Sequence, residues 1–207
     1  MAQVSTHSPS PTIASAPSLG AHFADPAPLG LAAFALTTFM LSSFNSGLAP
    51  KSAEVVVLGV ALFYGGIAQL FAGMWEFAKG NTFGALAFSS YGAFWMSFWY
   101  LVSHGADLPT TGTDAAKGIG VFLLAWTIFT LYMTVVSSRI SGILFLLFAV
   151  LTLTFVFLTI GSFGGSASMT KVGGYLGLLT ALVAWYGSFA GVLNGTAKRV
   201  VLPTWPR

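Results

Sequence analysis

The sequence predicts an all-α integral membrane protein with six transmembrane helices per protomer and both termini in the cytoplasm. Of its 207 residues, 56% are hydrophobic and only 6% are charged, whereas soluble domains devote about a quarter of their residues to charge. The apolar residues gather in six stretches of about 20 residues, the length that an α-helix needs to cross a hydrocarbon core. Short segments between these stretches hold almost all of the charge.

The composition excludes several classes of protein. A soluble globule, a coiled coil or a disordered chain could not hide this much apolar surface. The chain has no cysteine, which excludes disulfides, thiol catalysis and thiolate-held metals. A net charge of +3 without a basic cluster is too small for a surface that binds the phosphate backbone of a nucleic acid. We therefore expect membrane lipid as a partner, no nucleic acid, no cofactor and no metal.

Three segments follow one another along the chain. Residues 1–24 carry no charged residue, are rich in Ser, Ala and Pro, and do not resemble a signal peptide. Such a composition cannot bury enough surface to fold, so we expect a disordered tail. Residues 25–195 form the six-helix transmembrane domain, and residues 196–207 a short cytoplasmic tail.

We expect the six helices over residues 28–47, 54–74, 83–103, 119–138, 140–162 and 172–193. The fifth stretch begins directly after Arg139, so a very tight turn should join it to the fourth. At the start of the first helix, either Asp25 or Ala27 is suited to be the N-cap, and the prolines near them are tolerated where the first N–H groups lack partners.

The orientation follows from the basic residues. Lys79, Arg139, Lys198, Arg199 and Arg207 fall on the side of the termini, against Lys51, Lys117 and Lys171 on the opposite side. Lys and Arg are retained in the cytoplasm, so this excess favours cytoplasmic termini.

Small residues four apart allow helices to approach closely. Such pairs occur at Gly173 and Gly177, at Gly187 and Gly191, and at Ala68 and Ala72. They indicate either tight packing within one bundle or an interface between subunits.

No Asp, Glu, Lys, Arg or His lies near the centre of any predicted span, although pumps and proton relays usually keep such groups there. The histidines His7, His22 and His104 lie in the tail and in an outer loop, and no His-Glu-x-x-His motif occurs. We therefore expect neither an intramembrane protease nor any other enzyme activity.

The polar residues at depth are uncharged. Hydroxyls in such helices usually bond back to their own helix or join neighbouring helices. Alternatively, they line a narrow neutral path for a small neutral molecule or a small monovalent anion. The candidates for such a lining are Thr37, Thr38, Asn45, Gln69, Ser89, Thr130 and Thr152.

One segment and several strings after it resemble a known family. The segment is Asp25, Pro26, Ala27, Pro28, Leu29, Gly30 and Leu31. It is similar to the Asn-Pro-Ala-Pro-Leu-Gly-Leu signature of the acetate uptake transporter family, the succinate–acetate permeases and their fungal acetate/ammonia relatives. The strings over residues 63–69, 79–84 and 87–95 match in order and spacing, with Gly73 and Glu76 between the first two. The resemblance covers residues 25–203.

This resemblance implies a six-helix protomer that assembles as a homo-hexamer in the plasma membrane, the inner membrane in a bacterium. Each protomer would pass acetate and, as in the bacterial members, succinate, either as a proton-coupled permease or as an anion channel. The resemblance also places a constriction of the path at Phe34, Tyr91 and Leu151. In place of the signature's Asn the chain has Asp25, whose carboxylate should repel anions.

The depths of the three constriction residues agree with this expectation. Counted from the cytoplasmic side, Phe34 lies about seven residues into its helix, Tyr91 about nine and Leu151 about eleven, so their heights differ by at most roughly 6 Å. An ordinary core layer would show the same pattern. Two other functions stay open at this point, namely a path for another small solute such as ammonia and a membrane scaffold that transports nothing.

Overall fold

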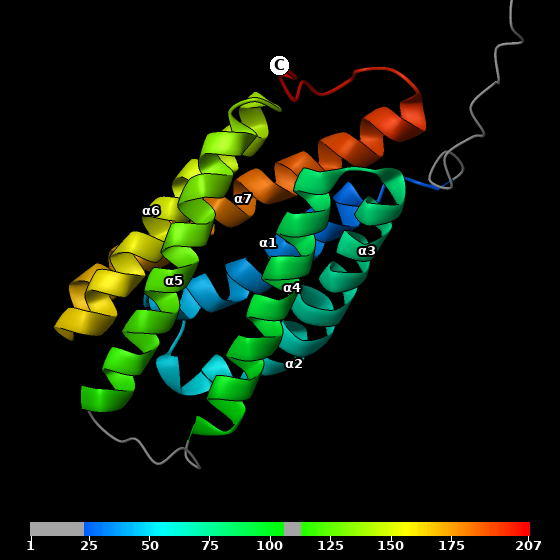
Figure 1. The fold of residues 1–207 in the computed structure, drawn as a ribbon. Coiled ribbons are helices and arrows are strands. Elements are labelled where there is room, and N and C mark those ends of the chain that lie inside the picture. The colour runs from blue at the N-terminus through cyan, green and yellow to red at the C-terminus, as the bar shows by residue number, and fades with distance from the viewer. Residues whose placement is uncertain (1–22, 106–112) are drawn as a thin grey trace, which may run out of the picture.

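A computed structural model describes residues 23–105 and 113–207, which are almost entirely helical (Figure 1). The predicted disordered tail lies outside the described residues, except for its last two. The elements are α1 (Ala27–Asn45), η2 (Lys51–Val56), α2 (Val57–Leu62), η3 (Phe63–Ala68), α3 (Gln69–Lys79), α4 (Thr82–Ser103), α5 (Thr113–Ser137), α6 (Gly142–Gly164) and α7 (Ala167–Ala197).

The elements η2, α2, η3 and α3 follow one another without a break and form one helical stretch over Lys51–Lys79. A π-helical turn, η3, lies in its middle. This stretch, α1, α5, α6 and α7 are long and apolar enough to cross a membrane. The helix α4 occupies the place of the predicted third span, with 22 residues that include many aromatic, Gly and Ser side chains. The chain is thus a multi-pass membrane protein.

The helix ends differ from the predicted ones. The predicted ends lie where the apolar stretches stop, whereas in the structure capping residues determine where a helix begins or ends. Asn81, Ser141 and Ser166 each accept a hydrogen bond from a backbone N–H of the first turn of α4, α6 and α7. Gly80 and Gly165 end α3 and α6 with φ of +75° and +60°, a conformation that glycine adopts without strain.

The start of α1 differs from the prediction, and neither Asp25 nor Ala27 is its N-cap. Pro26 takes that position, and Ala27 is the first helical residue. Proline fits there because it has no N–H to satisfy. The Asp25 carboxylate still contributes, because its Oδ1 accepts a hydrogen bond from the Ala27 N–H at 3.3 Å.

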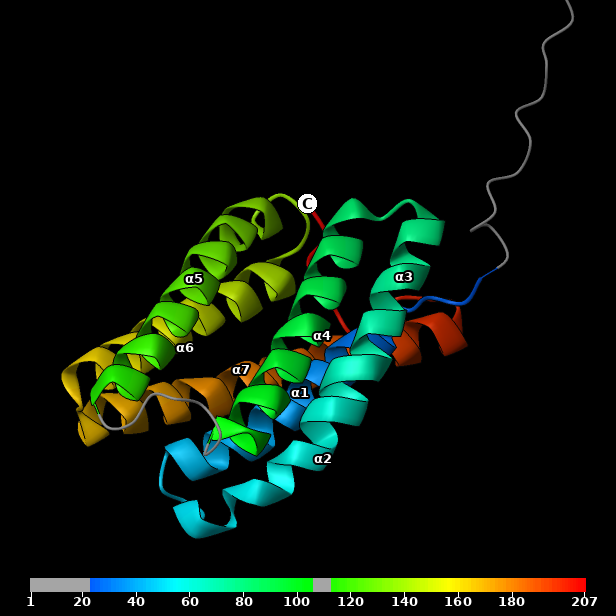
Figure 2. The same ribbon diagram turned by 60° about the horizontal axis from the view of Figure 1, so that its bottom comes forward.

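The helices pack mainly in pairs, α1 on α7, α6 on α7, α5 on α6 and α3 on α4. Figures 1 and 2 show α3 and α4 side by side, and α5 facing α4 from the other side of the bundle. The turn between α5 and α6 is as short as predicted, since α5 ends at Ser137 and α6 begins at Gly142.

The small residues of α7 serve packing within this bundle. A side chain at Gly191 would meet Pro28 of α1 at 2.9 Å, and one at Gly173 would meet Leu158 of α6 at 2.8 Å. Gly177 lies against Ser42 of α1. Of the two alternatives, these contacts correspond to tight packing within one bundle.

The segment after α7 folds back over the start of α6. The Gly142 N–H donates to the Trp205 carbonyl at 2.8 Å, and the Arg207 N–H donates to the Ile140 carbonyl at 3.0 Å. Asn194 of α7 holds this segment through three hydrogen bonds, to the Val201 N–H, the Leu202 N–H and the Leu202 carbonyl.

Candidate functional site

Two cavities extend into the bundle from its opposite ends. The first, of about 430 Å³, is lined at its mouth by Asp25, Asn81, Ser141 and Asn194. These four residues flank the starts of α1, α4 and α6 and the end of α7, so all four helix ends lie at this end of the bundle. Inward, the first cavity reaches side chains of α1, α4 and α6.

The second cavity has a volume of about 340 Å³ and lies at the other end of the bundle. Asn45, Lys51 and Glu54 line it near the end of α1 and the start of η2, and Thr170 lines it near the start of α7. Its mouth is therefore formed by the helix ends that the first cavity does not reach.

A single layer of buried side chains separates the two cavities. Phe34, Tyr91 and Leu151 line the inner end of the first cavity, and Phe94 and Phe155 line the second. Tyr91 and Phe94 are three residues apart on α4, and Leu151 and Phe155 four residues apart on α6, so the separation is about one helical turn, roughly 5 Å. We call these five residues the barrier layer.

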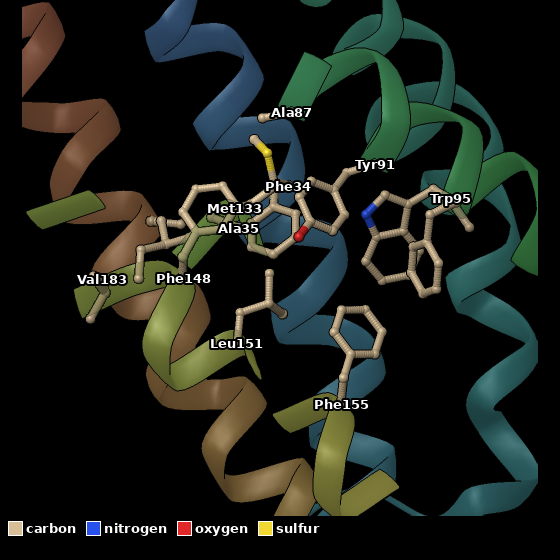
Figure 3. Close-up of a cluster of buried hydrophobic side chains, with 14 of the residues drawn as sticks. Phe34, Ala35, Ala87, Tyr91, Trp95, Met133, Phe148, Leu151, Phe155 and Val183 are labelled. Atoms are coloured by element: carbon tan, nitrogen blue, oxygen red, sulfur yellow. The ribbon is translucent and has the colours of Figure 1, made fainter. Parts of the chain in front are cut away.

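Ring contacts fill the barrier layer. The centroids of Phe34 and Tyr91 lie 5.5 Å apart, and those of Phe94 and Phe155 also 5.5 Å, edge to face. In Figure 3, Leu151 lies near both the Tyr91 ring and the Phe155 ring. All five side chains are at most 5% exposed, so a solute that passes between the cavities has to displace them.

The mouths of the two cavities carry charged side chains. At the first, the Lys79 Nζ lies 3.2 Å from the Asp25 Oδ1. At the second, the Lys51 Nζ lies 2.6 Å from the Glu54 Oε1 and 3.2 Å from the Asn45 Oδ1. Among the described residues, no group of His, Asp or Glu is placed to hold a metal ion.

Glu76 is the functional candidate that the sequence analysis missed. It lines the first cavity and is 1% exposed. Its Oε2 accepts a hydrogen bond from the Asn81 Nδ2 at 2.8 Å, while its Oε1 has no hydrogen-bond partner among the described residues. The predicted second span ends at residue 74, before Glu76, although Glu76 follows Gln69 by seven residues and thus shares a helix face with it.

The sequence pattern of the GPR1/FUN34/yaaH family matches residues 7–206. The chain belongs to this family. It is 40% identical over 183 residues to a protein of Escherichia coli K12 named succinate-acetate/proton symporter SatP, covering 87% of this chain and 94% of that one. The fold also matches the solved structure of the bacterial acetate channel SatP, with a TM-score of 0.81 and 39% sequence identity. The match covers 88% of this chain and 99% of the SatP chain.

Fungal members of the GPR1/FUN34/yaaH family are longer. The ammonia transport outward protein 2 of Saccharomyces cerevisiae is 42% identical over 176 residues, which are 82% of this chain and 62% of the yeast protein. The chain spans just under two thirds of the length of this and two other fungal relatives.

The three residues that the family resemblance singled out lie together. Phe34, Tyr91 and Leu151 come from three helices and all line the inner end of the first cavity, as their depths suggested. Their role as the narrowest point of a path stays a prediction.

Two of the seven residues predicted as a polar lining contact the cavities. Gln69 lines the first cavity and Asn45 the second, whereas Thr37, Thr38, Ser89, Thr130 and Thr152 lie outside the lining of both. The Thr37 hydroxyl donates to the Ala33 carbonyl at 2.9 Å.

Most threonines of α5, α6 and α7 instead join the helices. The hydroxyl oxygens pair across helix interfaces at 2.8 to 3.3 Å, as Thr134 with Thr152, Thr127 with Thr159 and Thr154 with Thr180. In each pair at least one hydroxyl also donates to the carbonyl four residues earlier. This is the structural role that such hydroxyls usually have.

Proposed function

We propose that this chain carries acetate and related short-chain carboxylates, succinate among them, across the plasma membrane. The observation that carries the proposal is the pair of opposed cavities with the barrier layer between them. Such an arrangement suits a small solute, because only about one helical turn of side chains has to move. Family relatives named acetate permease A and succinate-acetate/proton symporter SatP support the choice of solute.

The proposed topology has six spans and cytoplasmic termini. The starts of α1, α4 and α6 and the end of α7 lie at the end of the bundle that holds the first cavity. The excess of basic residues is found at this same end, which favours the cytoplasm for it. In this topology the first cavity opens inward and the second outward.

The proposed assembly is a homo-hexamer in which each protomer has its own path. The two cavities lie inside one chain, so no residue of a neighbour is needed to form the path. Apolar side chains on the outer faces of α5 and α7, among them Val121, Ile128, Leu131 and Leu182, are 54–60% exposed and would contact lipid or neighbouring protomers.

The barrier layer suits permeation and offers no means of catalysis. Its side chains are apolar, apart from the hydroxyl of Tyr91, and the lining of the first cavity contains no His–carboxylate pair or nucleophile–base pair among the described residues. We therefore propose a permease or channel that leaves its substrate chemically unchanged.

Ammonium is the second candidate substrate, favoured by one observation. Asp25 and Glu76 both line the first cavity, whereas no Lys, Arg or His does so among the described residues. Carboxylates attract a cation, and a yeast relative is named for ammonia transport.

The test is flux in proteoliposomes, measured with labelled acetate and with ammonium, with and without a proton gradient. Acetate flux above that of empty liposomes, lost when the barrier layer is altered, supports the proposal. Flux of ammonium alone would establish the second candidate. The absence of both would leave a protein that transports neither solute and would refute the proposal.

A further inference from the structure

We infer that Glu76 is the proton-binding residue of the first cavity, and that a carboxylate binds there by sharing one proton with the Glu76 Oε1. This inference rests on the proposed function and assigns to one residue the proton that accompanies the substrate. The argument starts from the two carboxylate oxygens of Glu76, which have different surroundings.

The two carboxylate oxygens of Glu76 differ in hydrogen bonding, since one accepts a hydrogen bond and the other accepts none from the described residues. The Asn81 side chain donates to Oε2 at 2.8 Å, and its own Oδ1 accepts the Gly84 N–H of α4 at 3.2 Å. This link fixes the carboxylate at the corner between α3 and α4. Oε1 is buried without a hydrogen-bond partner among the described residues, although leaving a buried acceptor without a partner is destabilising.

Glycine at position 84 provides the space for this carboxylate. A Cβ at Gly84 would lie 2.8 Å from the Glu76 Cδ, so any other residue there would force the Glu76 carboxylate to move. The Glu76 carboxylate therefore occupies a place that the start of α4 leaves free, on the wall of the first cavity.

No fixed cation on the cavity wall is available to receive an anion. The charged groups around Glu76 are Asp25, before α1, and Lys79, on the same helix. Lys79 pairs with Asp25 at the mouth, 3.2 Å apart, and the described residues that line the cavity include no basic side chain. An entering carboxylate thus meets a second carboxylate without a counter-ion.

One proton resolves this repulsion. Two carboxylates at close range cannot both stay ionised, and they bind a single proton between them. The proton comes from the aqueous side together with the anion, forms a hydrogen bond between the Glu76 Oε1 and one substrate oxygen, and leaves one negative charge on the pair. The apolar side chains Phe83, Phe88 and Leu147 line the same cavity and suit the methyl end of a short monocarboxylate.

Proton uptake on binding tests the inference. Acetate is titrated calorimetrically into the purified chain at several pH values, each in two buffers of different ionisation enthalpy. The wild-type chain should take up about one proton per acetate where free Glu76 is ionised. In that range its apparent affinity should fall about tenfold for each unit of rising pH, and at lower pH the affinity should level off.

Glu76→Gln separates the proton from the structural role. Its amide oxygen can still accept from Asn81, so the corner is kept, but it cannot bind a proton. This variant should bind acetate without proton uptake and with an affinity that does not change with pH. Asp114→Asn, at an exposed carboxylate on α5 that is not part of the lining of either cavity, is the matched control and should behave as the wild type does.

A measurement on the unaltered chain covers the case in which Glu76→Gln does not fold. The infrared difference spectrum on adding ¹³C-acetate should show the carbonyl band of a protonated glutamate, separated from the isotope-shifted bands of acetate. Proton uptake that persists in Glu76→Gln, or acetate binding by the wild type without a proton and without that band, would overturn the inference. A wild-type chain that binds and carries no acetate would refute the proposed function itself, and the inference with it.

Discussion

The hydroxyl oxygens of Tyr91 and Thr130 lie 2.8 Å apart and connect α4 with α5 inside the barrier layer. Thr130 also donates to the Trp126 carbonyl at 2.7 Å. Because this bond uses the Thr130 hydrogen, Tyr91 has to be the donor between the two hydroxyls. A carboxylate that passes the layer therefore competes with Thr130 for the proton of Tyr91.

We expect Tyr91→Phe to lower acetate flux, because the variant keeps the ring but removes the only hydroxyl of the barrier layer. A hydrogen bond to a charged group contributes about 1.5–3 kcal/mol, which corresponds to a fall of roughly 10- to 150-fold. The measurement is labelled acetate flux at equal amounts of protein. Tyr132→Phe, at a tyrosine that is 46% exposed on α5, is the control and should leave flux unchanged.

The variant Thr130→Val removes the hydrogen bond between Tyr91 and Thr130 by changing the acceptor instead of the donor. It keeps the shape of the threonine but frees the Tyr91 hydroxyl, so it should maintain or raise acetate flux. An equal loss of flux in Tyr91→Phe and Thr130→Val would instead assign the contact to structure alone.

Replacing Asp25 with Asn should raise acetate flux near neutral pH. The amide oxygen can still accept the Ala27 N–H, and Lys79 loses its partner and becomes free to attract anions. An exposed ion pair contributes less than about 1 kcal/mol, so we expect a gain of about two- to fivefold. Asp114→Asn, at the opposite end of the bundle and 75% exposed, is the control. Unchanged flux at every pH would place Asp25 outside the path.

The topology can be tested directly because the chain has no cysteine of its own. A cysteine at Lys117, near the start of α5, should react with an impermeant thiol reagent added outside intact cells. A cysteine at Arg139, in the turn after α5, should react only after the membrane is opened. The reverse pattern of labelling would invert the proposed orientation.

The sequence predicts the helices because long apolar stretches mark most of them, α4 being the exception with its many aromatic, Gly and Ser side chains. The two helix starts at Ser141 and Ser166 show what the sequence does not provide. Each serine caps a helix by accepting a single N–H, and many serines in the chain could have done so. The position of a cap depends on which turn the tertiary packing forms, so the prediction missed the start of α6 by two residues and that of α7 by five.

The candidate site was only partly predictable from the sequence. The convergence of Phe34, Tyr91 and Leu151 followed from a family resemblance and from depth. Glu76 was missed because a carboxylate normally marks the end of a span, and its burial depends on Asn81 and on the space beside Gly84. Similarly, Thr130 was predicted to line the path because the sequence does not show that its hydroxyl is already bonded to Tyr91 of α4.

Leu151 is the residue of the barrier layer that should control the size of the substrate. It lies near the Tyr91 and Phe155 rings (Figure 3) and is 3% exposed. Leu151→Ala removes bulk without touching a polar group, so it should favour succinate and lactate over acetate, since the larger solutes need more room. The cavity left behind costs about 2–5 kcal/mol of stability, so the amount of folded protein must be measured with the flux.

The measurement for Leu151→Ala is competition of unlabelled lactate and succinate against labelled acetate in cells that make each variant. Leu153→Ala, two residues away on the same helix and 49% exposed, removes the same atoms from the outer surface and should leave the preference as it is. The milder Leu151→Val should shift the preference in the same direction but less. If Leu151→Ala folds and ranks the three solutes as the wild type does, Leu151 is a core residue and the narrowest point lies elsewhere.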